Sequence, residues 1–184
     1  MNDKEIIKTS KFLSLILRHE PERVGLKLGE GGWVDVGELL AAVNRHGVSL
    51  SMDDLKHIVA TSDKKRFAMT EDGARIRASQ GHSVEVDLLY APQQPPELLY
   101  HGTATRFLES IRQQGLKKME RHDVHLSAET KLTLQVGGRH GKPALLTIRA
   151  GEMRRAGFEF RCSANGVWLV DHVPAEYIEF PNGE

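Results

Sequence analysis

The sequence has one cysteine, no net charge and no long apolar run, and each of these absences excludes a class of protein. Cys162 has no second cysteine to pair with, so no disulfide can form within the chain, which fits a reducing compartment. No apolar run approaches the length of a membrane span, and the charged start Met1-Asn2-Asp3-Lys4-Glu5 lacks a signal-peptide core. We therefore expect a soluble, cytoplasmic protein with no membrane partner, and a monomer.

The balance of charge limits how the chain could bind a nucleic acid. Lys plus Arg number 25 and Asp plus Glu number 25, so bulk charge gives no sign of a nucleic-acid partner. Any anion site must then be local. The 184 residues, 40% of them hydrophobic, suffice for one domain or two small ones.

The common signatures of nucleotide, hydrolase and metal sites are also missing. There is no Walker A sequence, no Gly-x-Gly-x-x-Gly and no Gly-x-Ser-x-Gly. His122-x-x-His125 could supply two metal ligands, but no second His or Cys pair stands at zinc spacing. We therefore expect no metal site.

The chain does contain four Arg-His pairs, more than chance predicts for nine histidines. They are Arg18-His19, Arg45-His46, Arg121-His122 and Arg139-His140. The last lies between glycines, in Gly137-Gly138-Arg139-His140-Gly141. Glycine lets backbone approach a ligand closely, and the arginine fork suits phosphate oxygens, so this pentapeptide is a candidate anion cradle. A flexible surface turn is the alternative.

The N-terminal half has the pattern of three helices followed by a β-hairpin. Helices are predicted over residues 4–19, from Asp35 to Gly47, and from Ser51 to about Thr61. Strands are predicted over 66–70 and 74–77. This is the layout of a winged helix-turn-helix. A DNA-binding winged helix is one hypothesis, but the third helix begins with acidic residues where a recognition helix would carry Arg, Lys, Asn or Gln.

The C-terminal half reads as a small, mostly β domain. The proline-rich residues 91–97 are predicted to link residues 1–90 to residues 98–184. A strand is expected at 98–103, a helix at 104–114 capped by Thr103, and a strand at 124–127 whose Ser127 caps a further helix. Strands are also expected over 144–148, 158–163, 167–170 and 177–180. The whole chain is therefore predicted to be α+β.

Two histidines, His101 and His125, fall at the ends of predicted strands. A strand-end His-Gly-Thr could hydrogen-bond ribose hydroxyls, although each histidine alone could be a half-buried sheet residue. Arg18-His19 falls at the end of the first helix, where the helix dipole alone favours cations. The run Lys64-Lys65-Arg66 could likewise be a solvated basic turn.

Seven collinear motifs spanning nearly the whole chain resemble those of the tRNA/RNA 2′-phosphotransferases, the KptA/Tpt1 family, and of bacterial KptA in particular. They are Leu17-Arg18-His19, Ser62-Asp63-Lys64-Lys65-Arg66-Phe67, Arg77-Ala78-Ser79-Gln80-Gly81-His82-Ser83, Tyr100-His101-Gly102-Thr103, Val124-His125-Leu126-Ser127, Gly138-Arg139-His140-Gly141 and Asn165-Gly166-Val167-Trp168.

The resemblance implies a fold and a reaction. It implies an N-terminal winged-helix lobe for RNA and a C-terminal lobe similar to ADP-ribosyltransferases for NAD, which is consumed as a co-substrate without a metal. It implies that an internal RNA 2′-phosphate, in a tRNA-like substrate, attacks the nicotinamide ribose and expels nicotinamide. The ribose 2″-hydroxyl then attacks the phosphate, leaving 2′-OH RNA and ADP-ribose 1″,2″-cyclic phosphate. An ADP-ribosyltransferase that stops after the first step is the alternative enzyme.

The resemblance also implies roles for single residues. The family's phosphate-binding and catalytic set matches Arg18, His19, Arg66 and Arg139. Its NAD-binding positions match His101, Gly102, Thr103, His125, Ser127, Gly138 and Val167. Many other ADP-ribosyltransferases have a glutamate where Val167 stands, and its absence fits an acceptor that is already anionic.

Overall fold

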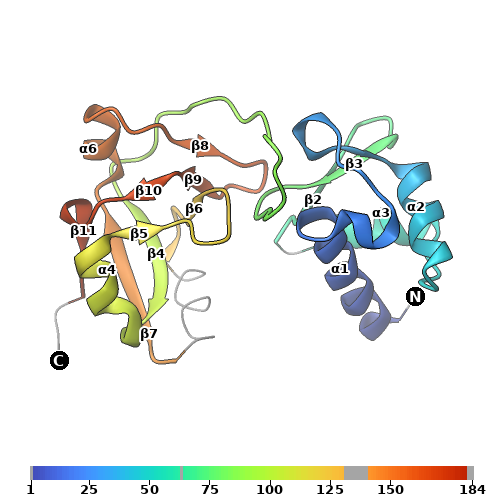
Figure 1. Cartoon of the computed structure of the whole chain (residues 1–184), viewed down its shortest axis with the longest axis horizontal. Coiled ribbons are helices and arrows are strands. Elements are labelled where there is room, and N and C mark those ends of the chain that lie inside the picture. Colours follow the sequence, from blue (N-terminus) through green and yellow to red (C-terminus); the bar gives the residue numbers. More distant parts are fainter. Residues whose placement is uncertain (1, 63, 131–140, 182–184) are drawn as a thin grey trace. The chain divides into compact units, whose positions relative to one another are not determined.

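The computed structural model describes residues 2–62, 64–130 and 141–181, and it divides into two compact units (Figure 1). Unit 1 is Met1–Leu89 and unit 2 is Tyr90–Glu184. Both combine short helices with small antiparallel sheets, so the α+β class predicted from the sequence is confirmed.

Helix α1 (Asp3–Arg18) opens unit 1, and its ends match the sequence pattern. The Asn2 side chain accepts a hydrogen bond from the Glu5 amide at 3.0 Å, and the Glu5 carboxylate accepts one from the Asn2 amide at 2.8 Å. This capping box satisfies two amides that the helix itself leaves unpaired. Pro21 then begins the short 3₁₀ helix η1 (Pro21–Val24), so α1 ends close to Arg18 and His19.

Two further helices and a three-stranded sheet complete unit 1. Helices α2 (Val36–Arg45) and α3 (Met52–Ala60) start at the predicted caps Asp35 and Ser51. The predicted hairpin is present as β2 (Phe67–Met69) and β3 (Arg75–Ala78).

A third strand, β1 (Val34–Asp35), was not predicted from the sequence. It follows a second 3₁₀ turn, η2 (Glu30–Gly32). It pairs antiparallel with β3, so the order of the sheet is β1-β3-β2. Two residues are too few for a periodic pattern, and the partner Ile76 lies far along the chain.

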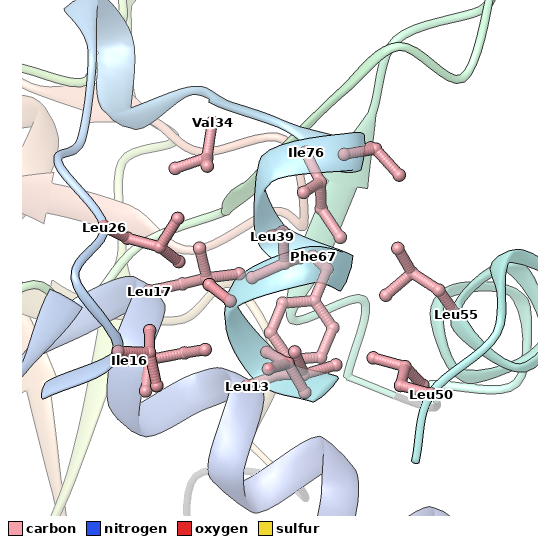
Figure 2. Close-up of a cluster of buried hydrophobic side chains, with 14 of the residues drawn as sticks. Leu13, Ile16, Leu17, Leu26, Val34, Leu39, Leu50, Leu55, Phe67 and Ile76 are labelled. Carbon is pink, nitrogen blue, oxygen red and sulfur yellow. The ribbon is translucent and has the colours of Figure 1, made fainter. Parts of the chain in front are cut away.

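The core of unit 1 collects apolar side chains from every element. Figure 2 shows the Phe67 ring of β2 among Leu13 of α1, Leu39 of α2 and Leu55 of α3. Leu13, Leu39 and Leu55 are completely buried. Because burial of one such side chain stabilises a protein by about 1.5–3 kcal/mol, this cluster fixes how α1 lies on the hairpin.

The main sheet of unit 2 is built around β7 (Pro143–Ile148), with β4 (Leu99–Ala104) on one side and β11 (Ile178–Glu179) on the other. Contrary to the prediction, Thr103 is not a helix cap, because the strand runs through it to Ala104. Pairing of Thr103 with Ala144 and of Ala104 with Pro143 extends the strand, which local pattern could not show. A 3₁₀ turn, η3 (Thr105–Phe107), leads into the shorter helix α4 (Leu108–Gln114).

A second sheet has the order β6-β9-β8, formed by β6 (Val124–Leu126), β9 (Trp168–Val170) and β8 (Arg161–Cys162). The predicted strand over 158–163 is therefore much shorter. A two-stranded ribbon of β5 (Leu116–Lys117) and β10 (His172–Val173) and the helix α6 (Ala150–Arg155) were not predicted. A last 3₁₀ turn, η5 (Ala175–Tyr177), precedes β11.

Residues 91–97, which we expected to act as a linker, make contacts within unit 2. Pro92 bridges to Arg161, and the Gln93 amide donates to the Phe160 carbonyl at 2.8 Å. The Glu97 carboxylate accepts two hydrogen bonds from the Arg155 guanidinium, at 2.8 and 3.1 Å. This bidentate pair ties the start of unit 2 to α6.

Among the described residues, no helix combines the length and the apolar composition needed to span a membrane. Within the same ranges, no three His, Cys, Asp or Glu side chains lie close enough together to hold a metal ion.

Candidate functional site: an anion groove and a histidine pair

One candidate site, in unit 1, lies at the C-terminal end of α1. Arg18 occupies the last turn and is half-buried, and His19 is the exposed residue that follows. The carbonyl of Arg18 accepts a hydrogen bond from the Ser83 amide at 2.9 Å, and His19 Nδ1 lies 2.8 Å from Ser83 Oγ. Residues 83–84 therefore hold both the backbone and the imidazole in place, although only the end of a helix was evident in the local sequence.

Arg66 is brought to the same place by the approach to β2. Arg18 Nη2 donates to the Arg66 carbonyl over 3.5 Å, and the Ser79 amide donates to the same oxygen at 2.9 Å. The Arg66 amide donates to Ser62 Oγ at 3.3 Å. Lys65, immediately before it, has φ of +41°, a left-handed conformation that turns the chain into the strand. The structure thus brings Arg18, His19 and Arg66 together from distant parts of unit 1.

These three residues line one end of a groove of about 560 Å³ between α1 and the end of α3. Its other lining residues are hydroxyl, apolar and basic: Ser10, Ser14, Thr61, Ser62, Ile6, Ile7, Leu15, Ile58 and Lys11. No described residue that lines it is acidic. Two guanidiniums, a lysine and a histidine, with no carboxylate among the described lining residues, make a local site for an anion in a chain of zero net charge.

A second candidate site lies in unit 2, where its two larger sheets meet. The Tyr100 amide donates to the Ser127 carbonyl at 2.8 Å, and the Ser127 amide donates back to Tyr100 at 2.9 Å. This antiparallel bridge joins β4 to the chain just after β6. His101 on β4 directly follows the bridge residue Tyr100, and His125 on β6 lies two residues before the bridge residue Ser127.

The two histidines are held in opposite tautomers by their partners. His101 Nδ1 lies 3.0 Å from the His125 carbonyl, which can only accept, so Nδ1 carries the proton and Nε2 is the ring's acceptor when neutral. His125 Nδ1 lies 3.1 Å from Arg121 Nη1, which can only donate, so His125 keeps its proton on Nε2. The pair therefore offers one acceptor and one donor.

The surroundings of His101 favour its neutral form. Burial lowers the pKa of this imidazole below its ordinary value, and the positive charge of Arg121 lowers it further, against the hydrogen bond to His125. At neutral pH His101 is then an uncharged acceptor.

Of the remaining predicted site residues, the structure places Gly102, Thr103 and Ser127 but does not describe Gly138 and Arg139. Gly102 and Thr103 follow His101 on β4, and the Thr103 side chain is only 8% exposed. Ser127 Oγ accepts from the Glu129 amide at 3.0 Å, a local turn, but the predicted helix beyond it falls largely on residues 131–140. Gly138 and Arg139 lie outside the described residues, so the structure does not place them.

Val167 precedes β9, the neighbour of β6. Its amide donates to Ser163 Oγ at 3.1 Å within the Ala164-Asn165-Gly166 turn. Val167, which the resemblance assigns to the NAD-binding positions, thus lies half-buried just before the central strand of the sheet that carries His125.

Ser83 and Arg121 were not assigned roles from the sequence. Ser83 stands in one of the quoted motifs, and Arg121 begins one of the Arg-His pairs, so both positions carried a signal. What each contacts depends on folding: Ser83 follows His19 by 64 residues, and the Arg121–His125 contact needs the turn before β6.

Two other histidine groups have structural explanations. Arg45 and His46 bond the carbonyls of Ala41 and Ala42 at the end of α2, as expected for a helix terminus. In His122-x-x-His125, the Arg121 contact occupies His125 Nδ1.

Comparison with known proteins gives one consistent result. A model of the RNA 2′-phosphotransferase, Tpt1 / KptA family, matches residues 4–172. A protein of Streptomyces coelicolor is 51% identical over 181 residues, covering 98% of this chain and 98% of its own length. A protein of Flavobacterium johnsoniae is 52% identical, over 98% of this chain and 99% of its own length. A protein of Agrobacterium fabrum is 55% identical, over 92% of this chain and 91% of its own length. Each is named a probable RNA 2′-phosphotransferase.

The matches run through both units and through all the described site residues, at about half identity over nearly full length. The chain belongs to the RNA 2′-phosphotransferase family, the Tpt1 / KptA family.

Proposed function

We propose that this protein is an NAD-dependent RNA 2′-phosphotransferase, which removes an internal 2′-phosphate from a tRNA-like RNA. The observation that carries the proposal is the convergence of Arg18, His19 and Arg66 in one groove with no acidic residue among its described lining. A phosphomonoester carries about −1.5 to −2 charges at neutral pH, so it needs more than one cation at close range.

In this proposal unit 1 is a winged-helix module that holds the phosphate. The element order and the strand order β1-β3-β2 support it. Arg18 and Arg66 hold the phosphoryl oxygens, and His19, fixed through Ser83, adds a further donor. Such contacts position the phosphate for attack and neutralise charge that changes during transfer.

The donor set of unit 2 fits NAD, in a lobe that we propose to be similar to ADP-ribosyltransferases. NAD supplies the electrophilic ribose carbon and a nicotinamide leaving group. His101 Nε2 accepts from a ribose hydroxyl, His125 Nε2 donates, and the backbone at Gly102 allows close approach. Thr103, Ser127, Gly138 and Val167 belong to the same site by their match to the family's motifs.

The neutral state of His101 suits this role. A protonated imidazole could not accept from a hydroxyl, and it would repel the positive charge that develops on the ribose as nicotinamide leaves. The acceptor phosphate is already anionic, so it needs positioning more than a general base. We propose that neither step requires a metal ion.

The test is incubation of the purified protein with NAD and an RNA carrying one internal 2′-phosphate. We expect one nicotinamide to be released per 2′-phosphate removed, and this activity to persist in the presence of EDTA. We also propose that the active protein is a monomer in solution. Nicotinamide release with an RNA that keeps an ADP-ribosyl group would instead identify an ADP-ribosyltransferase that stops after one step. No nicotinamide release would contradict both, and would favour a non-catalytic winged-helix regulator.

A further inference from the structure

The groove in unit 1 extends well beyond the residues that would hold one phosphate. Ile7, Lys11, Ser14 and Arg18 all line it, and their spacing of four, three and four residues places them in one stripe along α1. At about 1.5 Å per residue this stripe is about 16 Å long. A single phosphate at Arg18 would use only its C-terminal end.

Folding does not explain the composition of this stripe. The core face of α1 is formed by Thr9, Leu13, Ile16 and Leu17, which are buried, whereas Ile7 is 57% exposed. Lys11 is also exposed, and no carboxylate of the described residues lies within ion-pair distance of it. An exposed apolar side chain beside an uncompensated ammonium is a combination that suits a nucleotide, with its apolar base and its anionic phosphodiester.

A third observation comes from Ser14. Its hydroxyl is covered from solvent and has no hydrogen-bond partner among the described residues. Leaving a buried hydroxyl unpaired costs free energy, and this one lines the groove midway between Lys11 and Arg18. Rotation of the Ser14 side chain about χ1 would bring the hydroxyl to the surface of the groove, where a phosphodiester oxygen would accept its hydrogen bond.

We infer that this stripe binds the ribonucleotides that lie beyond the reacting dinucleotide, with one of their phosphodiesters at Lys11 and Ser14 and a base against Ile7. The inference rests on the proposed function, which places the 2′-phosphate at Arg18, His19 and Arg66. It assigns the protein a short stretch of RNA as its recognition unit, rather than an isolated 2′-phosphate. Binding through one backbone phosphate and an apolar surface carries little sequence preference.

The experiment compares oligonucleotides of different length by fluorescence anisotropy. One probe is a dinucleotide whose 5′-terminal ribose carries the 2′-phosphate beside the phosphodiester. Two other probes extend it by three nucleotides, one on the 5′ side and one on the 3′ side. The variant is Lys11→Ala. The matched control is Lys8→Ala, which removes an exposed lysine of the same helix that does not line the groove.

We expect one extended probe to bind wild-type protein more tightly than the dinucleotide. Lys11→Ala should weaken that extended probe roughly fivefold or more, leave the dinucleotide within twofold and lower the salt dependence by about 0.7 in log–log slope. Lys8→Ala should change neither probe. Equal affinity of the wild-type protein for all three probes would overturn the inference while the proposed function stands. The same holds if Lys11→Ala and wild-type protein bind the extended probe equally well. A wild-type protein that binds dinucleotides with and without the 2′-phosphate equally would contradict the proposed function, and the inference with it.

Discussion

At the scale of single residues, the guanidinium of Arg18 is the group on which binding of the 2′-phosphate should depend most. Arg18→Lys keeps the charge but loses the flat fork that can hold two phosphate oxygens at once. We expect single-turnover removal of the 2′-phosphate to slow by roughly 10²–10³, which corresponds to about 3–4 kcal/mol of transition-state stabilisation. NAD affinity, measured by calorimetry, should change little.

Arg45→Lys is the matched control for this substitution. Arg45 also precedes a histidine at the end of a helix, but its side chain bonds the Ala41 carbonyl, and it does not line the groove. Its rate should remain within about twofold of wild type. Equal effects of the two substitutions would mean that Arg18 acts only at the helix terminus.

The neutral state of His101 makes stability depend on pH in a defined direction. The pKa of the His101 imidazole lies below its ordinary value of 6.5 in the folded protein, whereas in the unfolded chain it returns to about that value. Between the two pKa values the unfolded chain therefore holds more protons, and the free energy of unfolding falls as the pH falls. The loss begins near pH 6.5, cannot exceed about 1.4 kcal/mol per pH unit, and ends below the folded pKa.

His101→Asn tests this assignment, since asparagine keeps a donor for the His125 carbonyl and does not titrate. Urea denaturation of both proteins at pH 7.5 and pH 5.5 gives the four free energies of unfolding. The decrease from pH 7.5 to pH 5.5 should be smaller in the variant. An identical decrease in both proteins would show that His101 titrates normally.

The residue types of the candidate site could be predicted from the sequence, but their contacts could not. Arg18, His19, Arg66, His101 and His125 all stood out as motif residues. The Ser83 hydroxyl on His19 and the Arg121 guanidinium on His125 set ring orientation and tautomer, and both are consequences of the chain path. The roles of Gly138 and Arg139, which rest on the family resemblance, stay predictions because these residues lie outside the described ranges.

At the scale of elements, the turn between α4 and β5 depends on one glycine. Gly115 has φ of +70° and ψ of −169°, a region that other residues rarely adopt. A Cβ there would lie 2.2 Å from the Val173 carbonyl oxygen, which belongs to the strand paired with β5. We expect Gly115→Ala to lower the free energy of unfolding by roughly 2–4 kcal/mol, because both conformation and contact are violated.

Gly47→Ala separates these two causes. Gly47 also has a positive φ, +78°, but nothing lies within 4 Å of where its Cβ would be. Chemical denaturation should show a loss of only about 1 kcal/mol there, the cost of the left-handed conformation. A loss at Gly115 no larger than at Gly47 would mean that the β5–β10 ribbon shifts to accommodate the methyl group.

Elements with a strong local signal were predicted correctly, and those made by distant pairing were not. The three helices of unit 1 begin at side-chain caps readable in the sequence. By contrast, β1, β5 and β10 are two residues long and exist because a remote strand pairs with them. The same cause moved the end of β4 beyond Thr103, into a segment whose local pattern indicated a helix.

At the scale of the whole molecule, zero net charge predicts strong discrimination between RNAs. Without a general positive field, affinity for an ordinary RNA backbone should be low and should depend weakly on salt. We expect an RNA with one 2′-phosphate to bind at least tenfold more tightly than the same RNA without it, in an anisotropy titration at near-physiological salt. Arg66→Ala should remove most of that difference. Equal binding of the two RNAs would contradict a site built for the 2′-phosphate.

The central claim, that the 2′-phosphate is transferred to the ADP-ribose moiety of NAD rather than hydrolysed, is tested most directly by following the phosphorus atom. An RNA labelled with ³²P only in its 2′-phosphate is incubated with the protein, with and without NAD, and the products are separated. The account predicts that the label leaves the RNA only when NAD is present, and that it is recovered in ADP-ribose 1″,2″-cyclic phosphate with a free 2′-hydroxyl in the RNA. Label released as inorganic phosphate in the absence of NAD would contradict it.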